Sequence, residues 1–99
     1  MRVDLHQPPT RVHRLTLDQL PARQTATIRH VHVPPGDDGR LRRRLLELGF
    51  VPGERVQVLR RVFFGLGPLA VRVGTSTFAM RKLESSLIEV EAHAALSRR

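Results

Sequence analysis

Two histidines in an alternating stretch are the first side chains in this sequence that could do chemistry. His30 and His32 lie two positions apart in the segment 25–33, where Ala26 and Ile28 share their face of a predicted strand. Side chains at this spacing leave a strand about 7 Å from each other. They could bind a zinc or ferrous ion if another histidine or a carboxylate completed the site. Histidine is also an ordinary strand residue and two ligands are too few for a tight site, so we predict a weak metal site at most.

The sequence is strongly basic, and arginine supplies nearly all of its positive charge. The formal net charge is +8, and Lys82 is the only lysine. Arg40, Arg43 and Arg44 fall on one side of a predicted helix, away from its apolar stripe. This face is either simply solvated or a patch that binds an acidic protein surface or the anionic inner leaflet of a membrane.

Two adjacent phenylalanines are the clearest candidates for a docking contact. Phe63 and Phe64 lie in a predicted loop, and neighbouring residues of an extended segment point to opposite sides, so both cannot enter one small core. In one interpretation at least one ring is exposed, with Leu66 beside it, and anchors the chain in a groove of a partner. In the other, Phe64 closes the end of a barrel and Phe63 is covered by the N-terminal segment.

The groups that catalysis needs are missing from the sequence. Ser85 and Ser86 have no histidine nearby in the sequence, there is no glycine-rich phosphate loop, and no paired carboxylates stand at a spacing that suggests a shared site. The chain has no cysteine, which excludes disulfides, thiolate metal sites and cysteine nucleophiles. We therefore expect a binding protein and not an enzyme.

One helix is predicted clearly, over residues 40–48. Leu41, Leu45 and Leu48 recur at helical spacing, and Asp37 or Asp38 offers an N-cap. Gly49 then suits the left-handed residue that follows a helix, and Phe50 could fold back on the last turn. Pro52-Gly53 predicts a tight turn directly afterwards.

The rest of the pattern is mainly β. Strands are predicted at 25–33, 55–62, 68–73, 75–80 and 87–91, with short helical turns at 16–20 and 81–86. Gly67, Pro68 and Gly74 are taken as turn residues. We expect one domain over residues 16–91, a flexible arm at 1–15 and a frayed tail at 92–99. Five short strands with one helix inserted after the first favour a small closed or nearly closed barrel.

Several segments together resemble the FeoA family, the ferrous iron transport protein A domains. The helix and its exit, LRRRLLELGFVPG over 41–53, resemble the family's Leu-x-x-Leu-Gly, hydrophobic residue and Pro-Gly signature. GPLAVRVG over 67–74 and FAMRKLE over 78–84, followed by Ile88-Glu89-Val90, are similar to its later strands. The resemblance covers roughly residues 17–91. The chain departs from the family at Arg23, where members often have glycine, and in the loop that contains Phe63.

The resemblance implies an SH3-like barrel of about five strands with one inserted α-helix and short helical turns. It also implies a cytosolic accessory protein of bacterial ferrous iron uptake, whose partner is FeoB, a membrane iron transporter with a cytosolic GTP-binding domain. The same barrel is appended to metal-dependent repressors of the DtxR type. No cofactor is implied, and iron transport by the family does not require this chain to hold the iron.

Two other functions stay open beside this one. A small basic barrel could track nucleic-acid phosphates, but tyrosine and tryptophan are absent and the clustered arginines lie on a helix. Weak Fe(II) or Zn(II) binding at His30 and His32 would instead make a metal sensor or carrier. Residues 1–10 lack the apolar run of a signal peptide, and no segment approaches the roughly 20 apolar residues of a membrane span, so we expect a cytoplasmic protein, peripheral at the membrane through its partner. A homo-oligomer is compatible with the sequence.

Overall fold

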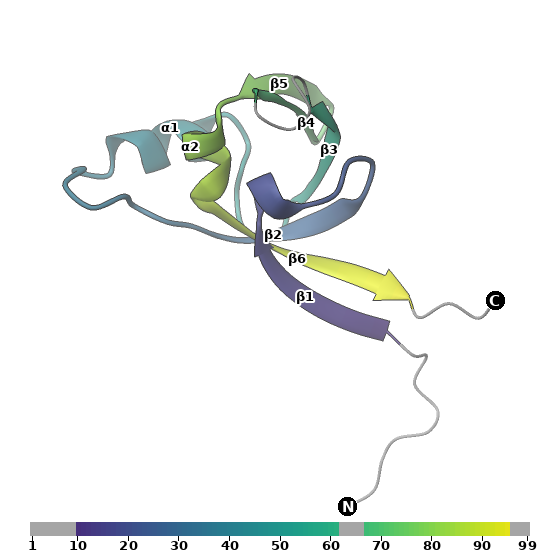
Figure 1. The fold of residues 1–99 in the computed structure, drawn as a ribbon. Helices are drawn as coiled ribbons and strands as arrows, with labels where there is room; N and C mark the ends of the chain where they lie inside the picture. The colour runs from purple at the N-terminus through teal and green to yellow at the C-terminus, as the bar shows by residue number, and fades with distance from the viewer. Residues whose placement is uncertain (1–9, 62–66, 96–99) are drawn as a thin grey trace, which may run out of the picture.

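The fold is built around one antiparallel sheet, seen in a computed structural model that describes residues 10–61 and 67–95 (Figure 1). The sheet has six strands in the order β1-β6-β2-β3-β4-β5. In chain order the elements are β1 (Thr10–Thr16), the 3-10 helix η1 (Leu17–Gln19), β2 (Thr25–Val31), α1 (Arg40–Glu47), β3 (Arg55–Arg61), β4 (Leu69–Val73), β5 (Ser76–Met80), α2 (Lys82–Ser86) and β6 (Ile88–Ala95). The prediction of a mainly β chain with one inserted helix and short helical turns is confirmed. Among the described residues, no helix is long and apolar enough to cross a membrane.

The N-terminal arm and the C-terminal tail expected from the sequence are wrong over residues 10–15 and 92–95. These segments belong to β1 and β6, which pair in antiparallel register from Thr10 opposite Ala95 to Thr16 opposite Glu89. Figure 1 shows the two strands leaving the curled part of the sheet together. β1 carries no hydrophobic alternation that would mark it in the sequence, because its apolar residues Val12 and Leu15 are three positions apart.

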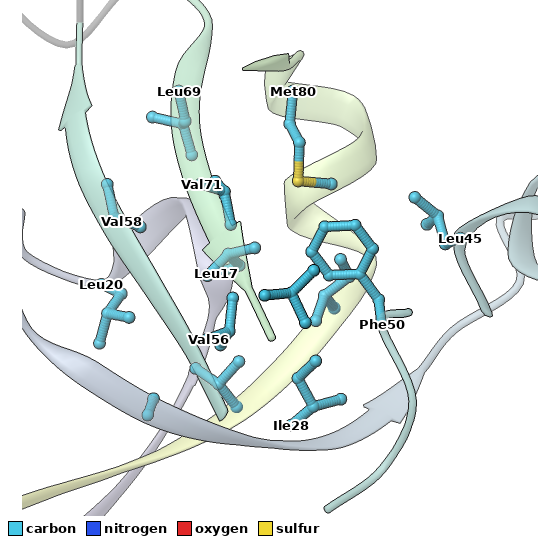
Figure 2. Close-up of a cluster of buried hydrophobic side chains, with 14 of the residues drawn as sticks. Leu17, Leu20, Ile28, Leu45, Phe50, Val56, Val58, Leu69, Val71 and Met80 are labelled. Carbon is cyan, nitrogen blue, oxygen red and sulfur yellow. The ribbon is translucent and has the colours of Figure 1, made fainter. Parts of the chain in front are cut away.

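The core fills the inside of the curled sheet. Figure 2 shows side chains from β2, β3, β4, η1 and the segment after α1 meeting around Phe50. Phe50 has no exposed surface, and its ring centroid lies 5.6 Å from that of Phe78 on β5. The buried apolar residues are Leu17, Leu20, Ala26, Ile28, Val31, Leu45, Phe50, Val56, Val58, Leu69, Val71, Val73, Met80, Leu87, Ile88, Val90 and Ala92.

The end of α1 aims Phe50 into this core, as the sequence predicts. Gly49 has a φ of +113°, in the region that residues with a Cβ rarely adopt. Its N–H donates to the carbonyl of Leu46, and the N–H of Phe50 donates to that of Leu45, both at 3.0 Å. This pair of bonds is the Schellman motif, which reverses the chain and satisfies carbonyls left free at the helix end.

The predicted turn at Pro52-Gly53 is also present, and the N–H of Glu54 donates to the carbonyl of Val51 at 3.1 Å. Gly74 connects β4 to β5, while Gly67 and Pro68 come directly before β4.

The start of α1 differs slightly from the expectation. The N-cap residue is Gly39, whose φ is +90°, and neither aspartate occupies that position. The carboxylate of Asp37 accepts from the N–H groups of Gly39 and Leu41, and that of Asp38 accepts from Arg40. The two aspartates therefore still accept hydrogen bonds from backbone N–H groups at the start of the helix, although both precede the N-cap residue.

A bulge in β2 corrects the predicted faces of that strand. Ile28 pairs with Val90, but His30 pairs with Glu89, so one extra residue is accommodated between them. After Ile28 the next buried residue is therefore Val31, three positions on, and His30 is exposed and does not share the buried face of Ile28.

Candidate partner-binding site

The arginine face predicted on α1 is exposed to solvent. Arg40, Arg43 and Arg44 are all exposed, whereas Leu45 on the opposite side is 2% exposed. Arg40 lies 3.6 Å from the carboxylate of Asp38. The ion pairs found within residues 10–61 and 67–95 include neither Arg43 nor Arg44.

Arg42 has a different task from the other arginines of the helix. Its Nε donates to the carbonyl of Val31 at 3.0 Å, which ties α1 to the end of β2. The exposed patch on the helix therefore consists of Arg40, Arg43 and Arg44, called the arginine face below.

An apolar groove opens beside the arginine face, between α1, β5 and α2. It has a volume of about 190 Å³. Figure 2 labels three of its lining residues, Leu45, Phe50 and Met80, each on a different segment of the chain. It is lined by Leu41, Arg44, Leu45, Leu48, Phe50, Phe78, Ala79, Met80 and Glu84. A charged residue of each helix, Arg44 and Glu84, thus borders a mainly apolar hollow.

The core does not bury every leucine of the apolar stripe on α1. Leu45 is buried, Leu41 is half-buried and Leu48 is 39% exposed, so the stripe of leucines runs from the core out to the surface. The sequence predicted all three as inward-facing. An exposed leucine next to a hollow is a typical place for a partner's apolar side chain.

The sequence candidates Phe63, Phe64 and Leu66 lie outside the described residues. Phe78 of β5, which was not a site candidate from the sequence, lines the groove. Its position on β5 leaves it partly covered, and only its contact with Phe50, distant in sequence, identifies it as part of this surface.

His30 and His32 do lie together, but on the outer side of the sheet. Their ring centroids are 4.4 Å apart, and both residues are exposed. Nε2 of His32 lies 3.0 Å from Oε1 of Glu89 on β6. This hydrogen bond holds the pKa of Glu89 below its ordinary value, and the positive charges of Arg14 and Arg29 act in the same direction.

This cluster does not complete a metal site within the part of the chain that is described. No group of three or more histidine, cysteine or acidic residues is arranged there to hold a metal ion. Structural and catalytic zinc sites use at least three protein ligands. Metal binding by the two histidines therefore stays a prediction.

Comparison with known proteins gives one consistent result. Residues 15–92 match the FeoA domain family. A crystal structure of Stenotrophomonas maltophilia FeoA complexed with zinc is 34% identical, with a TM-score of 0.71 over 82% of this chain and 96% of that one. That protein is described as an SH3 domain protein and as a candidate activating factor of ferrous iron transport. The predicted SH3-like fold is thereby confirmed.

Two further structures agree with it. The solution structure of iron(II) transport protein A from Clostridium thermocellum is 32% identical, with a TM-score of 0.69 over 79% of this chain and 45% of that one. A manganese-dependent transcriptional repressor shares the fold, with 22% identity and a TM-score of 0.64 over 87% of this chain and 43% of that one. No curated protein matches the chain.

Proposed function

Because the chain belongs to the FeoA family, which is associated with ferrous iron transport, we propose that it is a cytosolic accessory protein that binds the membrane iron transporter FeoB. The observation that carries the proposal is the apolar groove between α1, β5 and α2, bordered by the arginine face. The role is one of binding, and no reaction is assigned to the chain.

The groove is suited to one apolar side chain of the transporter's cytosolic region. Its lining includes the buried side chains of Leu45, Phe50 and Met80, and its volume is close to that of a single leucine or phenylalanine anchor. Burying such a side chain contributes about 1.5–3 kcal/mol. A central anchor of this kind, surrounded by weaker contacts, typically dominates the energy of an interface.

The arginine face supplies the polar part of the same interface. Arg44 lines the groove and Arg43, the residue before it, is exposed, so both can approach carboxylates on the partner. Charges at the edge of an interface mainly raise the association rate and select partners of opposite charge. Phe63, Phe64 and Leu66 stay proposed as a second set of anchors.

The test is the affinity of the purified chain for the cytosolic region of FeoB, measured by isothermal titration calorimetry. Replacing Leu48 with serine removes an exposed apolar contact of the groove without opening the core, and should weaken binding at least tenfold. Val33→Ser is the matched control, because Val33 is 45% exposed and lies outside the groove. Unchanged affinity on Leu48→Ser would contradict the groove as the docking site.

The loop anchors need a separate variant. A Phe63→Ala/Phe64→Ala double substitution should also weaken association while the circular dichroism spectrum stays that of the parent chain. If only this variant weakens binding, the contact lies in the loop and not in the groove. If the parent chain itself does not bind the cytosolic region of FeoB, the proposed partner is wrong.

A further inference from the structure

A second hollow lies on the outer face of the sheet, away from the core and from the arginine face. It has a volume of about 470 Å³, in the usual range for ligand-binding clefts. Strands β2, β3 and β4 and the two turns at Gly53 and Gly74 form it. It is lined by Thr25, Gly53, Glu54, Arg55, Val56, Gln57, Arg72 and Gly74.

Strand pairing places polar side chains in a row across this hollow. Thr25 pairs with Gln57, and Gln57 pairs with Arg72. Val56, Val71 and Val73 beside them are buried, so the members of the row point outward. The row offers hydroxyl and amide groups together with one guanidinium.

Arg55 adds a second guanidinium next to the first. It is two residues before Gln57 on β3, which makes it the diagonal neighbour of Arg72 across the ladder. Such neighbours are about 7–8 Å apart, within reach of long side chains. Within the described residues, neither arginine takes part in an ion pair, whereas Arg29 lies 3.6 Å from Glu91.

Two close guanidinium groups without a carboxylate partner repel each other, and a bound anion removes that repulsion. Arginine also binds carboxylates with two parallel hydrogen bonds. We propose that Arg55 and Arg72 form a binding site for the carboxylates of an acidic segment in a protein partner. The hydroxyl of Thr25 and the Oε1 of Gln57 then form hydrogen bonds with the backbone of that segment, while Nε2 of Gln57 stays bonded to the carbonyl of Arg23.

The same lining favours a protein over a nucleic acid. Single-stranded nucleic acids are bound by stacking their bases on aromatic rings, and none of the described residues that line the hollow is aromatic. Glu54 also borders the hollow, and its carboxylate can accept a peptide N–H, a donor that a phosphodiester backbone lacks.

The position of the site indicates how the segment would run. A third hollow of about 280 Å³ lies between the other two and shares Glu54 and Gly74 with this site and Leu48 with the apolar groove. A continuous track therefore leads from the apolar groove past the β4–β5 turn to Arg55 and Arg72. This extension rests on the proposed function, because it makes both sites contact one segment of the same partner.

The site itself is tested without that partner. The probe is a fluorescein-labelled hexaglutamate peptide, titrated with the full chain in 20 mM salt and followed by fluorescence anisotropy. The double variant Arg55→Ala/Arg72→Ala should weaken binding at least tenfold. Arg60→Ala/Arg81→Ala is the matched control, since it removes two exposed arginines outside the hollow and should change the affinity less than threefold.

Three outcomes decide the inference. Equal weakening by the two double variants would show that the peptide senses only net charge, and would overturn the site. Tighter binding of a ten-residue oligothymidine, lost in the same Arg55/Arg72 variant, would assign the site to nucleic acid. Leu48→Ser should leave hexaglutamate binding unchanged, so a failure of the apolar groove and a failure of this site are distinguished.

Discussion

The side-chain amide of Gln57 donates a hydrogen bond to the carbonyl oxygen of Arg23 at 2.8 Å, and it holds that residue in an unusual backbone conformation. Arg23 has a φ of +75°, the only positive value at a non-glycine residue among those described. Its own N–H donates to the carbonyl of Val58 at 2.6 Å. Two bonds from β3 therefore fix the turn before β2 and hold Arg23 in the left-handed region.

Replacing Arg23 with glycine should stabilise the protein. A residue with a Cβ in the left-handed region lowers the stability of the folded state by about 1–2 kcal/mol, and glycine would recover this. Part of the recovered stability is lost because glycine is more flexible in the unfolded chain. We expect the free energy of unfolding in urea to rise by about 0.5–1 kcal/mol. Arg60→Gly, in the interior of β3, removes the same side chain without relieving strain and should lower it. A decrease for both variants would contradict the strain at Arg23.

Replacing Gly49 with alanine should have the opposite sign. A Cβ at this position would lie 3.8 Å from Val73 Cγ1, an ordinary contact, so space is not the obstacle. The φ of +113° is the obstacle, and forcing alanine into it should cost about 1–2 kcal/mol in the free energy of unfolding. Glu47→Ala, two residues earlier, is the control and should change it by less than about 0.5 kcal/mol. Equal effects would mean that the helix exit is not the sensitive feature.

The elements that could be predicted from the sequence are those set by neighbours in the chain. The leucines of α1, Gly49 after it and the Pro52-Gly53 turn each act within a few residues, and all were predicted where they occur. The exposure of Arg43 and Arg44 follows from the same helical spacing. Local pattern was enough for these features because the physical cause itself is local.

The features that could not be predicted depend on segments far apart in the sequence. The pairing of β1 with β6 and the bulge after Ile28 are set by register against Glu89 and Val90. The groove needs Phe78 of β5 to lie beside Leu48 of α1. Nothing near either residue in the sequence signals that contact. The groove, which forms between elements, therefore could not be predicted from the sequence pattern. The exposed arginines beside it could be.

The pKa of Glu89 should depend on His32 and not on His30. The hydrogen bond from His32 is the largest cause of the lowered pKa, and His30 is not among its causes. His32→Ala should therefore raise the pKa of Glu89 toward its ordinary value, measured from the carboxyl carbon shift in a pH titration by NMR. His30→Ala should leave it unchanged. An equal rise in both variants would assign the effect to the histidine pair as a whole.

The lowered pKa of Glu89 also determines how the stability of the protein depends on pH. A lowered pKa means that folding favours the carboxylate of Glu89. Its contribution is complete above the ordinary pKa of glutamate and is lost as the pH falls through the lower pKa of the folded state. Stability near pH 7 should thus be insensitive to this carboxyl, and the difference between the parent chain and Glu89→Gln should shrink on acidification.

Association with the cytosolic region of FeoB should weaken as salt is added, and the arginine face should carry that dependence. Exposed charges are screened over about 10 Å at 0.1 M salt and about 3 Å at 1 M, whereas burial of an apolar anchor is not screened. The affinity of the parent chain should fall at least fivefold between 50 and 500 mM NaCl. Arg43→Ala/Arg44→Ala should bind more weakly at low salt and show a shallower dependence. Leu48→Ser should be weaker at every salt concentration with the parent's slope, since the two parts of the interface act through different forces. If the arginine variant keeps the parent's slope, the charges that steer the partner lie elsewhere on the chain.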